Sequence, residues 1–421
     1  MEVVISPVAS VERPPVGVTS VLELAGLYGP FTFPEKLLQK IWLRRAFEEN
    51  RACTTDGQKV TVLHTGRWNL LGGPDFKNAR MRFGEGPERM GDVELHLDAG
   101  DWLSHRHAHD PAYDGVILHV VLFAPPAGHV TRGASNSEIP VLVLLPLLYH
   151  DLEEYAAEDA VEQLANRPAA QIVESLSPLP LEKLTALLVA EAEKRWAQKV
   201  RYASLRIQRL GWTEACHQTA LDILGYRFNR APMVRVATHY PLDCWTSATT
   251  LDLRTVFDTG GDWSLQGLRP ANHPRVRLRQ YATWVACRPT WPTVVLGLPQ
   301  HLPEARLDSA TGEVRREHLF SQLRERWCEA VTGNALGGTR FDNLLCDGIF
   351  PLLAANGAFQ IKPLWFHWFM GDVPPLWRQA LRQLEIFSGR GRPACHGMAQ
   401  GLLGWLIERE RAATASTGRS A

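Results

Sequence analysis

Two short segments in the first quarter of the chain combine acidic residues with a histidine. Asp75 follows Gly72-Gly73-Pro74, a turn-forming sequence that can bend a carboxylate toward a neighbouring strand. Glu94 and His96 follow within the run GDVELHLD. Two carboxylates that meet can hold Mg²⁺ or Mn²⁺, which polarises a phosphate and lowers the pKa of an attacking water. We therefore expect Asp75 and Glu94 to be metal ligands and, with His96, catalytic residues.

The elements around these residues are predicted to be short strands. Alternation in residues 92–98 places apolar side chains on one face of a strand and Glu94 and His96 on the other. Gly, Pro and Asp clusters separate this run from other strand-like runs, at 59–66, 78–83, 115–124 and 139–146. A helix is expected over residues 35–50, after Pro34. A hairpin of 78–83 with 91–98 would let Asp75 and Glu94 reach one ion.

A structural role remains open for the same residues. Asp75 could cap a turn, Glu94 could lie solvated at a sheet edge, and His96 could be hydrogen-bonded locally. His105 and His107 are two residues apart on a segment expected to be extended, so both rings would share a face. They could bind a transition metal, contact a substrate phosphate or hydrogen-bond within a loop. Asn69, His105 and His107 form a possible additional site, whereas His119, inside an apolar run, is expected to be a core histidine.

The spacing of Pro74-Asp75, eighteen residues and Glu94-Leu95-His96 resembles the PD-(D/E)XK nuclease pattern. The order of one helix, several strands, a helix and a strand is also similar to that fold. The resemblance implies a restriction-endonuclease-like mixed sheet. It also implies a third polar group, usually Lys, that orients the water or offsets charge in the transition state. His96 stands here in the place of that Lys. The sequence thus departs from the pattern at a position on which catalytic activity depends.

A wider set of motifs resembles a large bacterial family of cytoplasmic proteins of unknown function. The motifs are GRWN, GPDFKNA, GDVELH, DW followed by HRH, YDGVILHVV, GYRFNRAP, LRPANHPRVRLRQYA and FDNLLCDGIFPLL. They span nearly the whole chain and imply no activity. One departure lies in PACHGMAQG, where Cys395 and Gly401 are kept but Met398 stands where a Cys would be expected. A metal-binding or redox role of that stretch is therefore not expected here.

Composition indicates a globular protein of more than one domain. A chain of 421 residues is too long for one ordinary core. Lys plus Arg and Asp plus Glu both number 45, so any DNA- or RNA-binding role needs a local basic patch. The seven cysteines form no CxxC pair, which predicts reduced thiols in a cytoplasm. We expect no secretory signal and no membrane span, because the apolar runs are too short.

Four segments are predicted: a flexible arm over 1–20, an α+β nuclease-like domain over 21–165, an all-helical domain over 166–412 and a disordered tail over 413–421. The runs after residue 150 are long and rich in Ala, Leu, Glu and Arg, which favour helices. The helical domain could contact a nucleic-acid backbone through Arg269, Asn272, Arg275 and Arg277, because arginines clamp phosphates with paired hydrogen bonds. Alternatively, these arginines pair with carboxylates on a solvated face.

Three functional hypotheses follow. The first is a Mg²⁺- or Mn²⁺-dependent nuclease of PD-(D/E)XK type. The second is a non-catalytic nucleic-acid or protein-binding module on a nuclease-like fold. The third is a hydrolase of a small molecule with a metal ion on His96, His105 and His107, zinc being less favoured than Mg²⁺ or Mn²⁺ for the chain as a whole. No glycine-rich phosphate loop, GxSxG or HExxH occurs, so nucleotide-driven, serine-hydrolase and zincin interpretations lack support. The sequence identifies no protein partner.

Overall fold

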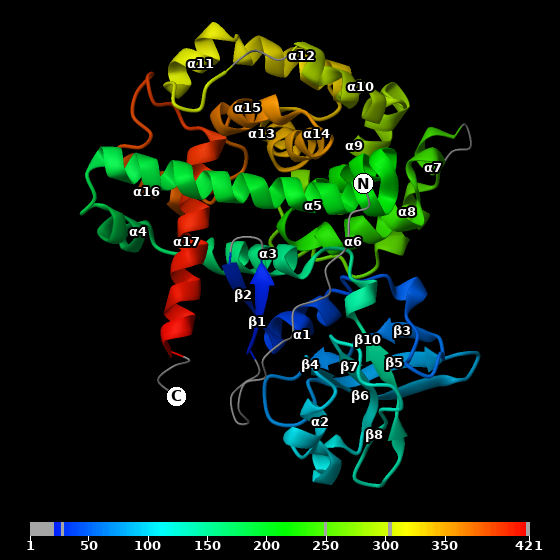
Figure 1. The fold of residues 1–421 in the computed structure, drawn as a ribbon. Helices are drawn as coiled ribbons and strands as arrows, with labels where there is room; N and C mark the ends of the chain where they lie inside the picture. The colour runs from blue at the N-terminus through cyan, green and yellow to red at the C-terminus, as the bar shows by residue number, and fades with distance from the viewer. Residues whose placement is uncertain (1–20, 27–28, 248–250, 302–304, 418–421) are drawn as a thin grey trace, which may run out of the picture. The chain divides into compact units, whose positions relative to one another are not determined.

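The computed structural model describes residues 21–26, 29–247, 251–301 and 305–417 (Figure 1). The chain forms two compact units. Of the described residues, the first contains 21–24, 32–40 and 49–147, and the second contains 25–26, 29–31, 41–48 and those from 148 onward. The predicted arm over 1–20 lies outside the described residues. The domain boundary predicted near residue 165 follows the first long helix of the second unit, whereas the structure divides before it.

A mixed sheet is the centre of the first unit. Its strand order is β10–β7–β6–β5–β3, with β4 paired to β5. β3 (Val60–His64), β4 (Arg67–Trp68) and β6 (Glu88–His96) are antiparallel to β5 (Phe76–Phe83). β7 (Val116–Val121) is parallel to β6, and β10 (Val141–Val143) is parallel to β7. The strand β6 therefore has an antiparallel neighbour on one side and a parallel one on the other.

Parallel strands need a long crossover connection, because a tight turn can join only antiparallel neighbours. Residues 97–115 supply it between β6 and β7, with α2 (Asp101–Ser104) and two 3₁₀ helices, His107–His109 and Pro111–Tyr113. β8 (Thr131–Arg132) and β9 (Glu138–Ile139) form a small separate pair, as do β1 (Val21–Gly26) and β2 (Gly29–Pro34). The helix α1 (Glu35–Leu43) begins directly after Pro34, as predicted.

Alternation along the strands explains the core of the first unit. In β5, Phe76, Ala79, Met81 and Phe83 are buried, while the arginines between them are exposed. This is the period of two that a half-buried strand requires. The last four residues of β6 are all buried, however. Both faces of β6 are therefore covered at its carboxyl end, which includes the face predicted to carry Glu94 and His96.

The second unit is largely helical. They are α3 (Leu152–Leu164), α4 (Ala169–Leu176), α5 (Leu181–Leu224), α6 (Tyr226–His239), α7 (Leu242–Thr246), α8 (Leu253–Gly260), α9 (Pro274–Cys287), α10 (Trp291–Gly297), α11 (Thr311–Glu317), α12 (Phe320–Thr332), α13 (Gly338–Asn343), α14 (Phe350–Ala355), α15 (Lys362–His367), α16 (Pro375–Gln383) and α17 (His396–Thr417). A π-helix, Leu344–Ile349, joins α13 to α14. The prediction of an N-terminal mixed sheet followed by a long helical region is confirmed.

Two further predictions concern the chain as a whole. All seven cysteines lie among the described residues and are free thiols. Within the described ranges, no helix is both long and apolar enough to cross a bilayer. The helix α17 includes residues 413–417 of the predicted disordered tail, and 418–421 lie outside the described residues.

The helix α5 is the longest element of the second unit, and α17 crosses it (Figure 1). A Cβ at Gly401 of α17 would lie 2.0 Å from the carbonyl oxygen of Leu188 in α5. The two backbones can therefore approach this closely only with glycine at position 401. The helix α5 is itself broken at Gly211, whose φ of 74° and ψ of 169° are not helical.

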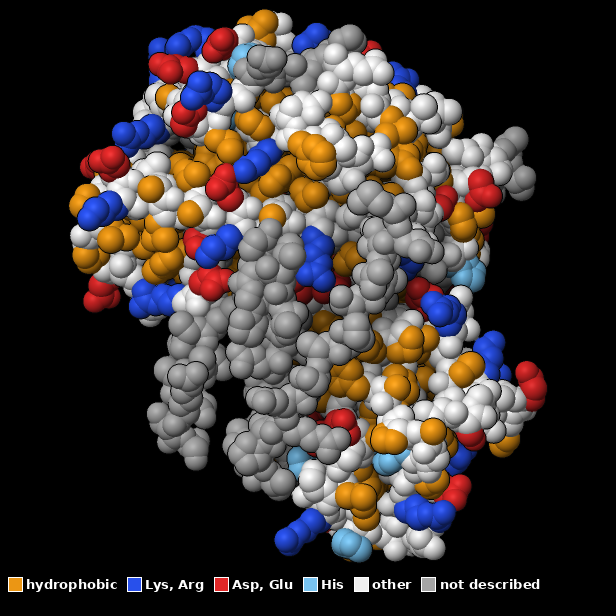
Figure 2. Space-filling view, viewed as in Figure 1, with side chains coloured by type: hydrophobic (Ala, Val, Ile, Leu, Met, Phe, Trp, Pro, Cys, Tyr) orange, Lys and Arg blue, Asp and Glu red, His pale blue; other side chains and the backbone are white. Residues whose placement is uncertain are grey.

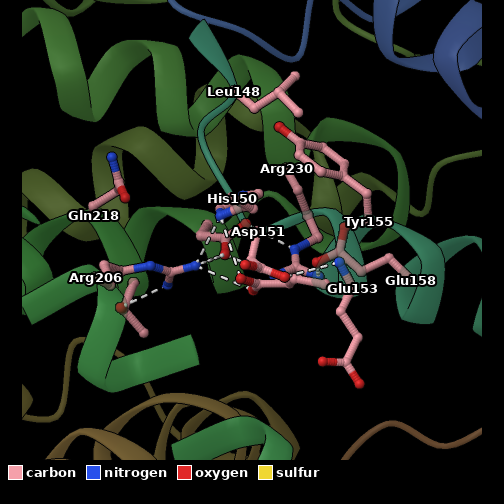
Figure 3. Close-up of polar contacts among 12 residues, drawn as sticks. Leu148, His150, Asp151, Glu153, Tyr155, Glu158, Arg206, Gln218 and Arg230 are labelled. Atoms are coloured by element: carbon pink, nitrogen blue, oxygen red, sulfur yellow. Dashed lines mark hydrogen bonds and ion pairs between the residues drawn. The ribbon is translucent and has the colours of Figure 1, made fainter. Parts of the chain in front are cut away.

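Buried charged residues join three helices of the second unit (Figure 3). Arg230 of α6 donates hydrogen bonds of 2.7 and 2.6 Å to Asp222 of α5, and it also pairs with Glu158 of α3. Arg206 of α5 lies 3.2 Å from Glu154 of α3 and 3.5 Å from Asp222. Burial would raise the pKa of Asp222, but the two guanidinium groups outweigh it and hold that pKa below its usual value. These residues line a cavity of about 310 Å³.

The substitution Gly401→Ala should destabilise the second unit. The added methyl cannot fit against Leu188, so α17 must shift away from α5 and lose packing, at a cost of about 1–3 kcal/mol. Chemical denaturation would measure the loss. Gly297→Ala is the matched control, since nothing lies within 4 Å of a Cβ at that position. Equal stability of the two variants would contradict a close approach of the helices at Gly401.

The substitution Arg230→Met should destabilise the second unit more strongly. It leaves the buried Asp222 and the partly exposed Glu158 without their shared guanidinium. Removal of one partner from a buried ion pair costs about 3–5 kcal/mol, and the buried member here is Asp222. The same denaturation experiment measures it. Arg306→Met is the control, because Arg306 pairs with Asp308 at the exposed surface and such pairs contribute about 0–1 kcal/mol. A loss of stability no larger than that of the control would contradict a stabilising role of the ion pairs of Arg230.

Candidate metal and catalytic site

Asp75 and Glu94 lie side by side at the junction of β5 and β6. The Asp75 backbone N–H donates to Glu94 Oε2 at 2.9 Å, and the Leu95 N–H donates to Asp75 Oδ2 at 3.1 Å. The strand pairing explains this, because Phe76, next to Asp75, pairs with Val93, next to Glu94. The structure thus brings together the two carboxylates that the sequence placed near one ion.

An irregularity in β5 shapes this end of the sheet. The register with β6 shifts between Phe76 and Ala79, and Asn78 has a positive φ of 56°. The Asp92 carboxylate accepts hydrogen bonds from the Asn78 N–H at 3.1 Å and from Lys77 Nζ at 2.8 Å. Such a bulge re-aims the residues beside it. The ammonium group of Lys77 is therefore engaged by Asp92 rather than by the carboxylate pair.

The helix α1 supports the pair from the other side. Gln39 Nε2 donates to Asp75 Oδ1 at 2.6 Å, and Gln39 Oε1 accepts from Trp68 Nε1 at 3.0 Å. Glu35, one turn earlier on α1, contributes a like charge that raises the pKa of Glu94. Sequence analysis did not identify Gln39 or Glu35. Their i, i+4 spacing on the polar side of a predicted amphipathic helix was the available signal.

The negative charges of the Asp75 and Glu94 carboxylates are poorly compensated by the groups around them. Burial, together with the neighbouring Glu94 carboxylate, raises the pKa of Asp75 to about 8, although hydrogen bonds from Leu95 and Gln39 act in the opposite direction. Burial likewise raises the pKa of Glu94 to about 8. Glu94 is only 4% exposed, which excludes the solvated sheet-edge alternative for this residue. Two buried carboxylates of this kind favour binding of a cation or a proton, so the residues present fit Mg²⁺ or Mn²⁺.

His96 is fully buried at the end of β6. Its Nδ1 lies 2.9 Å from His119 Nε2, and His119 Nδ1 lies 2.9 Å from Thr131 Oγ1. Burial lowers the pKa of His96 well below its usual value, and neighbouring histidines lower it further. A neutral imidazole cannot supply the positive charge that Lys gives in the PD-(D/E)XK pattern. His119 is buried on β7, as expected for a core histidine.

His105 and His107 converge on His96, although not by the predicted route. The segment is not extended: α2 ends, Arg106 adopts a left-handed φ of 62°, and a 3₁₀ helix begins at His107. The ring centroid of His96 lies 5.1 Å from that of His105 and 5.3 Å from that of His107. One ligand atom of each of the three histidines lies within 4.8 Å of the others. His107 is buried and stacks on Tyr113, with 3.8 Å between ring centroids.

The Asn69 side chain contacts the backbone of its own loop. Its Nδ2 donates to the carbonyl oxygens of Gly72, at 3.2 Å, and Pro74, at 2.9 Å, and its Oδ1 accepts from the Leu71 N–H. The Asn69 side chain therefore closes the loop that leads into Asp75. It thereby positions the first carboxylate, and its grouping with His105 and His107 stays a prediction.

The predicted phosphate-contact residues lie in the second unit and are only partly at its surface. Asn272 and Arg277 are buried, and Asn272 Oδ1 accepts from Arg277 at 2.7 Å and from Arg340 at 2.6 Å. These two residues are thus occupied internally, which corrects the expectation of a four-residue basic surface. Arg269 and Arg275 are exposed, and Arg275 lies over the Phe257 ring.

Removing the charge at Asp75 should stabilise the metal-free protein at high pH. The pKa of about 8 in the fold exceeds the value of about 4 in an unfolded chain. The stability due to the buried neutral carboxyl is therefore complete below pH 4 and is lost as the pH rises through 8. Asp75→Asn should exceed wild type by about 2 kcal/mol at pH 9, since Asp75 is partly exposed and one pKa unit is about 1.4 kcal/mol.

Guanidinium denaturation in EDTA at pH 5 and pH 9 measures this difference in unfolding free energy. Asp114→Asn is the control, because Asp114 is an exposed carboxylate of the same unit. Parallel pH profiles for wild type and Asp75→Asn would show that this carboxyl is not destabilised by burial.

Residues 35–257, more than half of the chain, match the model of a family described as "Protein of unknown function (DUF2851)". The matched range contains Asp75, Glu94 and the three clustered histidines. No curated protein matches the chain, and no solved structure does. The match confirms the resemblance to a family of unknown function that motifs such as GPDFKNA and YDGVILHVV indicated. The chain belongs to the DUF2851 family.

Proposed function

We propose that the first unit is a metal-dependent phosphodiesterase that acts on nucleic acid, with Asp75 and Glu94 as metal ligands. The observation that carries this proposal is the contact between the two residues, in which the Asp75 N–H donates to the Glu94 carboxylate at 2.9 Å. Bound Mg²⁺ or Mn²⁺ would polarise the phosphate and lower the pKa of a water. Asp75 and Glu94 would hold and orient that ion.

The topology around the pair supports the proposal. Asp75 precedes β5, Glu94 and His96 end the antiparallel strand β6, and a crossover leads to the parallel strand β7. This order is similar to the arrangement that the PD-(D/E)XK pattern implies. The likeness rests on order and register.

In the PD-(D/E)XK pattern a Lys usually orients the water or offsets charge in the transition state. Another group must take that role here. Burial lowers the pKa of His96 well below its usual value, so within this proposal it positions or binds rather than offsets charge. Lys77 lowers the pKa of Glu94, and its ammonium group is fixed by Asp92 at 2.8 Å. We assign to Lys77 the part of offsetting charge that develops on the phosphate.

In this proposal, most of the affinity for phosphate comes from the site itself. Among the described side chains on the face shown in Figure 2, basic and acidic groups are intermixed, without a continuous basic surface. Proteins that grip nucleic acid without an ion at the site rely on such surfaces. In the proposal, contacts at the bound ion replace them.

The three convergent histidines favour a second candidate function. A hydrolase of a small molecule would use a metal ion held by His96, His105 and His107. This candidate differs from the first in its metal ligands and in its substrate. Cleavage of a phosphodiester polymer would favour the first candidate, and cleavage of a small ester or amide would favour the second. Activity on neither substrate would favour a non-catalytic binding module.

Loss of either carboxylate should abolish cleavage. The assay uses supercoiled, linear and single-stranded DNA and RNA, with Mg²⁺ or Mn²⁺. Asp75→Asn and Glu94→Gln should each lower the rate at least about 100-fold, which corresponds to about 2.7 kcal/mol of transition-state stabilisation. Both changes preserve side-chain shape.

Glu88→Gln is the matched control for that assay, because Glu88 lies on the same strand β6 and is exposed. It should cleave at the wild-type rate. Cleavage that persists in EDTA, or that both carboxylate variants retain, would contradict the proposal.

A further inference from the structure

We propose that Glu94, His96, His105 and His107 form a nitrogen-rich site that binds one transition-metal ion of the Zn²⁺ class. The site shares Glu94 with the carboxylate pair but uses its other oxygen. Glu94 Oε2 accepts from Asp75, while Glu94 Oε1 faces the histidines. The inference goes beyond the proposed function, because it does not require that the protein cleave phosphodiesters.

The spacing of the donor atoms carries the proposal. His107 Nε2 lies 3.3 Å and His96 Nε2 lies 3.5 Å from Glu94 Oε1. Zinc bonds to nitrogen and oxygen are about 2.0–2.2 Å long, so two donors of a tetrahedral site are about 3.4 Å apart. Both measured distances agree with this separation. A ligand atom of His105 lies within 4.8 Å of one on each of the other two histidines.

The two buried nitrogens have no other partner among the described residues. His96 Nε2 and His107 Nε2 are buried, and neither makes a hydrogen bond, even with the Glu94 oxygen that both face. Buried polar groups are nearly always paired, so each such exception needs an explanation. An ion between these atoms would satisfy two nitrogens and one carboxylate oxygen at once. It would also compensate the charge of a carboxylate that is 4% exposed.

Hydrogen bonds behind His96 support the tautomer that a metal ligand requires. If His96 Nδ1–H donates to His119 Nε2, then His119 Nδ1–H donates to Thr131 Oγ1, each at 2.9 Å. The Nε2 lone pair of His96 then points to Glu94. Metal-binding histidines characteristically donate their second N–H in this way, which fixes the orientation of the ring. His119 and Thr131 are thus positioning residues for the site.

The crossover between β6 and β7 is built to direct two rings to one point. Arg106, between His105 and His107, holds a left-handed φ of 62°, a conformation that costs energy in a residue with a side chain. Tyr113 stacks on His107 from the far side of the same crossover. The backbone thus turns sharply so that His105, at the end of α2, and His107 meet beside His96.

The donor set selects the ion. Imidazole nitrogen suits Zn²⁺, Co²⁺ and other first-row transition ions, whereas Mg²⁺ prefers oxygen ligands and keeps much of its water. Three imidazoles and one carboxylate should therefore discriminate against Mg²⁺. The exposed position of His105 gives an ion a route to the buried donors.

The test uses the full chain, freed of metal with EDTA and titrated with Co²⁺ as a spectroscopic probe. One Co²⁺ per chain should bind with the visible absorption of a four-coordinate ion. Zn²⁺ should displace it, and Mg²⁺ in 100-fold excess should not. His105→Ala and His107→Ala should each weaken Co²⁺ binding at least about 10-fold, the lower end of losses seen when only a supporting residue is removed.

His109→Ala is the matched control and should bind Co²⁺ like wild type, because His109 is exposed and lies outside the cluster. Circular dichroism of each variant checks its folding, and His105→Ala, at an exposed residue, keeps the test valid if His107→Ala fails to fold. The site is overturned if wild type binds no stoichiometric Co²⁺, or if folded His105→Ala binds it unchanged.

These outcomes are independent of the proposed phosphodiesterase. Stoichiometric Co²⁺ binding without cleavage of any nucleic acid would overturn the phosphodiesterase and support the histidine site. Mg²⁺-dependent cleavage by a wild-type protein that binds no Co²⁺ would overturn the histidine site alone.

Discussion

Charge burial at the carboxyl end of β6 is the constraint on which the rest of the first unit depends. Glu94 and His96 are both almost completely buried there, and the pKa of Glu94 rises to about 8 because burial disfavours its charged form. A carboxylate in such surroundings requires a proton, a cation or several hydrogen-bond donors. The backbone of Asp75, the imidazoles and the helix α1 are arranged around that requirement.

The position of the site follows from the sheet. β6 is antiparallel to β5 and parallel to β7. Its carboxyl end therefore meets the beginning of β5, which carries Asp75, and also the start of the crossover, which carries His105 and His107. An all-antiparallel sheet would have put a tight turn there instead. The mixed topology brings carboxylate and imidazole groups from three parts of the chain to one place.

Sequence alone indicated the part of this site that depends on local pattern. The alternation around Glu94 and the glycine–proline turn before Asp75 were enough to place both carboxylates at one hairpin. Gln39 was missed because its contact with Asp75 joins residues far apart in the chain. The true path of His105 and His107 was missed because nothing in the composition of the HRH run signals a left-handed arginine.

The arginines of the second unit also show what the sequence alone does not predict, namely which side chains face solvent. A run such as RPANHPRVRLRQ has the composition of a phosphate-binding loop. Whether a guanidinium faces outward depends on distant neighbours, and Arg277 instead donates to Asn272 and Gln280. Likewise, the apolar period of α17 predicts a helix, but it does not show that Gly401 allows contact with the backbone of α5.

The break in α5 has a mechanical consequence. An unbroken helix of 44 residues would be a rigid rod about 66 Å long. Gly211 instead divides α5 into two helical segments that meet at a hinge. Arg206 lies before the hinge, and its partners Thr219 and Asp222, at 2.8 and 3.5 Å, lie after it. The angle between the two segments is thus stabilised by the contacts of the Arg206 guanidinium rather than by helical continuity.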